Sequence, residues 1–154
     1  MSILPWAREA LRSGTIASLV MMPVGFVFQA MGLRVGHYGP KFAQLWVDHP
    51  TPLLLFAQHV VLGWVSALPL LWWLVFIAGK SRPVLSGALY GSAYYVVVNS
   101  LALPLYFGDP LPWQLGLPTV IPSLLVHIIY GSSIGWTARR FCLVTALSRK
   151  PSNL

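Results

Sequence analysis

The sequence predicts an all-α membrane protein, with four transmembrane helices in an up-down bundle. Hydrophobic residues make up 56% of the 154 residues and charged residues only 8%. A typical soluble domain has about 25% charged residues. The polar connections separate four apolar stretches, each near the roughly 20 residues that a helix needs to cross a bilayer. A chain this poor in charge is therefore expected to have lipid as its main solvent.

The apolar stretches place the spans at residues 14–32, 53–78, 84–103 and 119–138, with outer connections over 33–52 and 104–118. Residues 2–12 predict a short amphipathic lead-in, and Pro23 predicts a kink in the first span. The aromatic and charged residues of 33–52 predict a short interfacial helix. The short turn at 79–83 predicts that the second and third spans are antiparallel neighbours. All four spans are expected to belong to one membrane domain.

Basic residues gather at one end of these spans, and the chain carries a formal charge of +7. Eight of the ten fall on one side: Arg8, Arg12, Lys80, Arg82, Arg139, Arg140, Arg149 and Lys150. Only Arg34 and Lys41 fall on the other side. The positive-inside rule then places both termini in the cytoplasm. Because the charges flank spans rather than forming a patch, we expect contact with anionic lipid and not with nucleic acid.

Two of the spans carry the same short pattern, a histidine followed by small residues at four-residue steps. The two sets are His59, Gly63 and Ala67 in the second span, and His127, Gly131 and Gly135 in the fourth. Residues four apart share a helix face. Each histidine lies about 10–13 Å from the outer end of its span at 1.5 Å per residue. The two imidazoles are therefore expected to face each other across the bundle.

Ionisable groups inside a membrane are candidates for function, and three interpretations of His59 and His127 remain open. In the first, each serves helix packing through one hydrogen bond, beside glycines that allow close approach. In the second, the two form a polar centre that takes up a proton as the outside acidifies. In the third, they are the axial ligands of haem b, and the small residues make room for the porphyrin.

Other residues predict contacts rather than chemistry. Gly87 and Gly91 form a small-xxx-small pair, which lets two helices pack closely in lipid. Gln29 and Asn99 are expected to make hydrogen bonds between helices. We found no nucleophile–base pair or phosphate loop in the sequence, so no enzyme is predicted. No metal site is predicted either, since no carboxylate or thiol accompanies the buried histidines and the pair Asp48-His49 is interpreted as solvated.

The two halves of the sequence resemble each other. Each half reads as a helix with small residues, an outer loop with aspartate and prolines (DHPTP and DPLPW), and a helix with the His-β-β-x-Gly pattern. This order indicates a parallel internal duplication. A further interpretation is an accessory subunit of a larger membrane complex, in which Gly87, Gly91 and the aromatic outer loops would contact the partner.

Residues 55–141 also resemble the YagU-like inner-membrane proteins, the family with the domain of unknown function DUF1440. The resemblance rests on Gly87-Ala88, the stretch LALPLYFGDPLPWQLGLP, His127 and the closing pair Arg139-Arg140, together with His59. Acidic residues expected shortly before the last histidine and before the arginine pair are missing here. The resemblance implies a bacterial inner-membrane protein, a homodimer, and a role in acid resistance.

Overall fold

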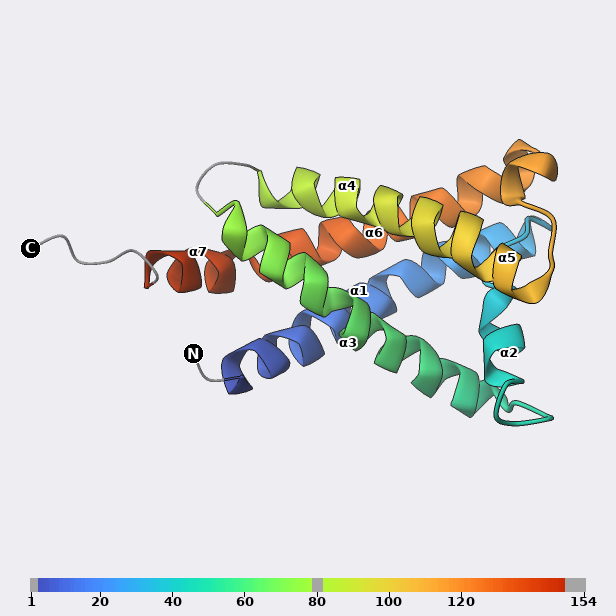
Figure 1. Cartoon of the computed structure of the whole chain (residues 1–154), viewed down its shortest axis with the longest axis horizontal. Helices are drawn as coiled ribbons and strands as arrows, with labels where there is room; N and C mark the ends of the chain where they lie inside the picture. Colours follow the sequence, from blue (N-terminus) through green and yellow to red (C-terminus); the bar gives the residue numbers. More distant parts are fainter. Residues whose placement is uncertain (1–2, 79–81, 149–154) are drawn as a thin grey trace, which may run out of the picture.

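The computed structural model describes residues 3–78 and 82–148, and every regular element within them is a helix (Figure 1). Four of these helices are long and apolar enough to cross a membrane. They are α1 (Leu4–Ala30), α3 (Pro52–Phe76), the continuous helix Pro83–Phe107, and α6 (Leu117–Thr137). The predicted all-helical class with four long apolar helices is confirmed for the described residues. Most of the predicted turn at 79–83 lies outside the described residues, as do Lys80, Arg149 and Lys150.

Short helices flank the long ones. They are α2 (Tyr38–Ala43) and the 3₁₀ helix η2 (Pro112–Gln114) in the two connections, and α7 (Arg139–Leu147) after α6. In Figure 1 the start of α1, the end of α3, the start of α4 and α7 lie at the left, while α2 and α5 lie at the right. We call these the α7 end and the α2 end of the molecule.

The first helix starts ten residues before the predicted span, so the expected separate lead-in at 2–12 is wrong. Glu9 lies on the packed side of this helix and is only 8% exposed. Its carboxylate accepts hydrogen bonds from Arg12, whose Nη2 also donates to the carbonyl of Thr137 at 2.8 Å. Because this ion pair fastens the first turns of α1 to the end of α6, the helix continues through them.

The third long helix changes its winding in the middle. It consists of α4 (Pro83–Tyr94), the π-helix η1 (Tyr95–Ala102) and α5 (Leu103–Phe107), and it extends four residues beyond its predicted end. Pro104 has no N–H group and cannot bond to the carbonyl four residues earlier. In η1 the Leu103 N–H instead reaches back five residues to Val98. The helix ends at Gly108, whose φ of +68° favours glycine.

The long helices pack as two close pairs. In these pairs, defined by contacts between glycines, α1 lies against α3 and α4 lies against α6, and α1 packs against α6 as extensively as against α3. Helix α3 makes few contacts with α4 and diverges from it toward the α2 end (Figure 1). The expectation that the second and third spans are close neighbours is therefore wrong over most of their length. In each close pair, glycines on one helix lie against the backbone of the other.

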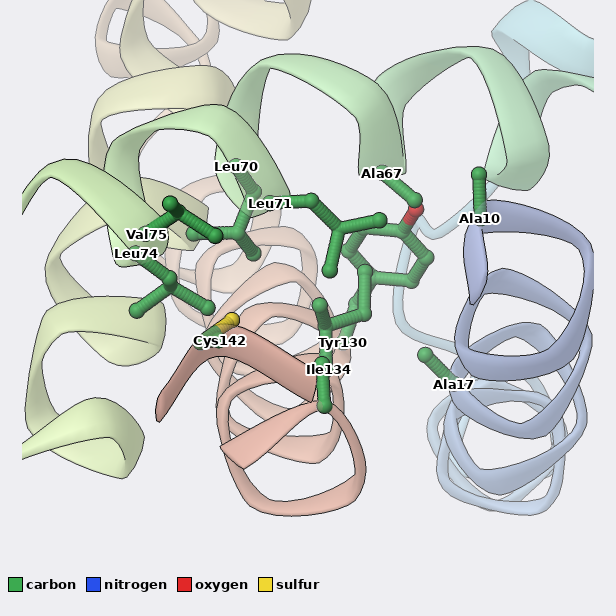
Figure 2. Close-up of a cluster of buried hydrophobic side chains, with 11 residues drawn as sticks. Ala10, Ala17, Ala67, Leu70, Leu71, Leu74, Val75, Tyr130, Ile134 and Cys142 are labelled. Carbon is green, nitrogen blue, oxygen red and sulfur yellow. The ribbon is translucent and has the colours of Figure 1, made fainter. Parts of the chain in front are cut away.

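A buried apolar cluster occupies the α7 end of the molecule (Figure 2). Its members come from α1, α3, α6, α7 and the residue between the last two helices: Ala10, Ala17, Ala67, Leu70, Leu71, Leu74, Val75, Tyr130, Ile134, Ala138 and Cys142. Leu70, Leu71 and Ile134 have no exposed surface. Burial raises the pKa of the Cys142 thiol in α7 to about 12, so it stays protonated and is a poor nucleophile near neutral pH.

Candidate functional site

The backbones of α4 and α6 touch along a line of glycines. A Cβ atom placed on Gly87 would overlap the carbonyl oxygen of Gly131, and one placed on Gly91 would overlap that of His127. One turn away, a Cβ on Gly135 would overlap the carbonyl of Pro83. No side chain larger than hydrogen fits at these positions without moving a helix, which is how glycine allows close packing in lipid.

The pair α1 and α3 repeats this contact with a matching register. A Cβ on Gly14 would lie 2.9 Å from the Gly63 carbonyl oxygen, and one on Gly63 would overlap the hydroxyl of Ser18. The ring of His59 interacts with the backbone of Ser18. Gly14 and Ser18 therefore face α3 at the same four-residue step at which Gly87 and Gly91 face α6.

In both contacts, α1 with α3 and α4 with α6, the space beside the glycines is occupied by other residues of this chain. The interpretation that Gly87 and Gly91 form the contact surface for a partner subunit is therefore wrong for these residues, because α6 covers them. The same holds for the expectation that Gly63 and Gly131 make room beside the histidines. Their free space is taken by Ser18 and by the backbone of Gly87.

His127 uses both of its ring nitrogens. Nδ1 lies 2.6 Å from the carbonyl oxygen of Ser123, and Nε2 lies 2.9 Å from Nδ2 of Asn99 on η1. A carbonyl can only accept, so Nδ1 carries the proton and Nε2 accepts from the amide. The rings of Tyr94 and Tyr95 lie on this imidazole, with centroids 5.7 and 5.8 Å away. His127 is thus held as a neutral ring in a single orientation.

The hydrogen bonding of His59 differs from that of His127. Its Nε2 is buried and has no hydrogen-bond partner within the part of the chain that the structure describes. The expected equivalence of the two histidines is therefore wrong for their hydrogen bonds, and their facing each other across the bundle stays a prediction. The repeat HVVLG and HIIYG could not reveal this difference. The partner of His127 is Asn99, which lies in another helix, and α1 offers His59 only Ser18 at the corresponding place.

A second polar group joins three helices one turn further toward the α7 end. The hydroxyl of Tyr130 donates to the Gly63 carbonyl and lies 2.9 Å from the hydroxyl of Ser66. The hydroxyl of Tyr90 donates to the carbonyl of Ser66 at 2.9 Å. These bonds tie α3 to both α6 and α4, and Ser66 is a member that the sequence pattern did not single out.

Gln29 does not make the expected bond between helices. It is exposed at the end of α1, and its amide Nε2 donates to the carbonyl of Val35 at 3.1 Å. The chain turns back at Gly32, where φ is +76°. This turn brings the carbonyl of Val35 close to the Gln29 side chain, which therefore bonds within its own connection and not to another helix.

The residues around the histidines do not fit a bis-histidine haem as they are arranged here. Axial ligation would need the Nε2 lone pair of each ring, and that of His127 accepts from Asn99. The space beside Gly63 and Gly131 is also filled. Among the described residues, no three His, Cys, Asp or Glu side chains are grouped so that they could hold a metal ion.

An ion pair joins the two connections at the α2 end. Lys41 Nζ lies 2.6 Å from Oδ1 of Asp109, and it also lies 5.7 Å from the centre of the Phe107 ring. The hydrogen bond from Lys41 lowers the pKa of Asp109 below 3.8. Burial, and next Arg34, lower the pKa of His37 below 6.5. His37 is thus the group of this cluster that resists charging in mild acid.

Acidification from pH 7 to 5.5 is expected to lower the thermal unfolding temperature of the purified protein in a way that depends on His37. The folded pKa of His37 is depressed, so the unfolded chain takes up this proton first as pH falls through 6.5. The Asp109 carboxylate stays ionised, since its contribution is lost only below 3.8. His37→Gln should reduce the loss, and the exposed His49→Gln should not. An equal loss in both variants would contradict this assignment.

No family model, curated protein or solved structure matches the chain. The similarity to the YagU-like family therefore stays a prediction, and the function must be inferred from the residues themselves.

Proposed function

We propose that this chain is a non-enzymatic protein of the bacterial inner membrane that responds to external acid through His59. The observation that carries the proposal is the difference between the two partly buried histidines. Both nitrogens of His127 are bonded, whereas Nε2 of His59 is buried without a partner among the described residues. A proton added to Nε2 of His59 displaces no hydrogen-bond donor among the described residues, while a proton added to Nε2 of His127 must displace the Asn99 amide.

The surroundings of His59 favour a response to its charge. Helix α1 contributes Ser18, α6 contributes His127, and the titratable groups on α4 and η1 near His127 are Tyr94 and Tyr95. The ion pair of Lys41 and Asp109 lies further out, between the two connections. A cation at His59 would therefore meet no carboxylate from these neighbours. Its charge would have to be relieved by hydration or by movement of α3, which is loosely packed against α4.

We further propose an up-down order with both termini in the cytoplasm and an origin by internal duplication. The charges of Arg8, Arg12, Arg139 and Arg140 lie in the α1 and α7 segments, and Arg34 and Lys41 lie around α2. This asymmetry supports a cytoplasmic α7 end. The matched register of Gly14 with Gly63 and of Gly87 with Gly131 supports the duplication. The resemblance to the YagU-like family favours acid resistance and a homodimer.

Histidine titration in the assembled protein tests the role of His59. The full chain, labelled with ¹⁵N-histidine and placed in lipid nanodiscs, is observed by NMR from pH 8 to pH 4.5. We expect one buried histidine to change from neutral to charged, with that change lost in His59→Gln. His127 should keep its Nδ1–H form in this range, because Asn99 and Ser123 hold it.

Two results would contradict the proposal. If neither buried ring becomes charged, His59 is a packing residue. If His127 becomes charged first and His59→Gln has no effect, the proton site has been assigned to the wrong ring. A parallel survival assay of acid-shocked cells carrying His59→Gln or His127→Gln would show whether the titration matters to the cell.

A further inference from the structure

The half of the molecule toward the α2 end contains buried polar atoms that no described protein group satisfies. They are the hydroxyl oxygens of Ser18, Tyr95 and Ser100, Oε1 of Gln58, and Nε2 of His59. Tyr95 is 3% exposed, Ser100 is 1% exposed and Ser18 has no exposed surface. An unsatisfied polar group in hydrocarbon costs several kcal/mol, so such groups almost always have a protein or water partner.

Four of these atoms belong to His59 itself or to residues beside one of the two histidines, namely Ser18, Gln58 and Tyr95. Ser18 contacts the His59 ring through its backbone, and the Tyr95 ring lies against His127. Gln58 precedes His59 on α3, and its Nε2 donates to the carbonyl of Gly39 in α2 at 2.9 Å. The unsatisfied atoms thus extend from the two histidines to the α2 helix.

Toward the α2 end, the group of unsatisfied polar atoms is bordered by Tyr38 in α2. Tyr38 is 8% exposed, and burial followed by the Asp109 carboxylate raises its pKa above 10. Tyr95 also acts on Tyr38 electrostatically. Tyr38 is therefore near both the buried Tyr95 and Asp109, whose ion pair with Lys41 is partly exposed.

Toward the α7 end, the group of unsatisfied polar atoms is bordered by the buried apolar cluster. Leucines, alanines, Ile134 and Cys142 fill the α7 end, and Figure 2 shows these side chains converging from α1, α3 and the segment that includes α6 and α7. Tyr130 borders this cluster, but its hydroxyl is bonded to Gly63 and Ser66. All five unsatisfied atoms lie outside the cluster.

We propose that the unsatisfied atoms line an internal water site, which opens past Tyr38 toward the α2 end and is closed at the α7 end by the apolar cluster. This inference rests on the proposed function, and it adds the side of the membrane from which protons would reach His59. Water held by Ser18, Tyr95 and His59 would carry protons between His59 and the outer side, and the apolar cluster would prevent their passage to the cytoplasm. The protein would then sense external acid without conducting protons.

X-ray hydroxyl-radical labelling of the full chain in nanodiscs, read by mass spectrometry, tests the water site. Radiolysis of bound water oxidises the side chains beside it. We expect Tyr95 and His59 to be oxidised several-fold faster than Cys142, although cysteine is the more reactive residue and Tyr95 and Cys142 are 3% and 2% exposed. In liposomes loaded with a pH dye, the protein should add no proton flux to that of empty vesicles.

Each result decides one part of the inference. If Tyr95 is oxidised no faster than Cys142, the site is dry and the inference is wrong, even if His59 still titrates by NMR. If Tyr95 is labelled but protons cross the vesicles, the closure at the α7 end is wrong. A labelled Tyr95 with an untitrated His59 would support the water site while removing the proposed function.

Discussion

Gly131→Ala is expected to destabilise the protein by about 1–3 kcal/mol, the usual cost of overpacking, although alanine is the better helix former. The new methyl group would overlap the carbonyl of Gly87, which is backbone and cannot rotate away. Helices α4 and α6 would have to separate along their whole contact. The backbone of His127 lies against Gly91 in the same contact. Separation of the two helices would therefore also loosen the hydrogen bond between His127 and Asn99.

Gly25→Ala is the matched control, since Gly25 is also a helical glycine inside an apolar span. A Cβ there would meet only a side-chain carbon of Val35 at 3.7 Å, an ordinary contact. Replacing an unconstrained helical glycine by alanine gains up to about 1 kcal/mol. The free energy of unfolding of both variants can be measured by SDS titration in mixed micelles. Equal effects of the two substitutions would mean that α4 and α6 do not touch at Gly131.

The sequence predicted the second and fourth long helices closely, because an apolar stretch long enough to cross a bilayer is visible in the composition alone. The second and fourth spans were placed within two residues of α3 and α6. The small residues at Gly63, Gly87, Gly91, Gly131 and Gly135 were recognised as packing positions, and the structure uses all five between helices. Glycines at a four-residue step in an apolar run are a local pattern, and close packing of helices is what they typically indicate.

The partner of each glycine could not be predicted, because a helix face does not indicate which other helix will cover it. The glycine contacts pair α1 with α3 and α4 with α6, and the sparse contact between α3 and α4 has no sequence signal. Ser18 was missed for the same reason. It lies in an apolar run and gains meaning only because Gly63 and His59 face it.

The difference between the two histidines depends on backbone geometry that the sequence does not reveal. Asn99 and Tyr95 both lie on the π-helical segment that ends just before Pro104. An α-helix over the same residues would present these side chains at a different angle to α6, because a π turn contains an additional residue. Pro104 was visible in the sequence, but its effect on the turns before it was not.

Asn99→Leu is expected to cost about 1–3 kcal/mol of stability, because it leaves a partly buried acceptor in an apolar span without a donor. The substitution removes the amide that donates to His127 Nε2 and leaves that nitrogen without this donor. Gln29→Leu is the control, since its amide is exposed and bonds to the Val35 carbonyl. It should change the free energy of unfolding by less than about 0.5 kcal/mol, as for other surface substitutions.

The double variant Asn99→Leu/His127→Leu separates the hydrogen bond from simple loss of polarity. If the bond accounts for the cost, removing both partners leaves no unsatisfied group, and the double variant should be more stable than Asn99→Leu alone. In Asn99→Leu, NMR should also show His127 becoming charged in mild acid, as proposed for His59, because its Nε2 is then free. Additive losses with an unchanged His127 titration would show that Asn99 does not hold this ring, and the distinction between the two histidines would fail with it.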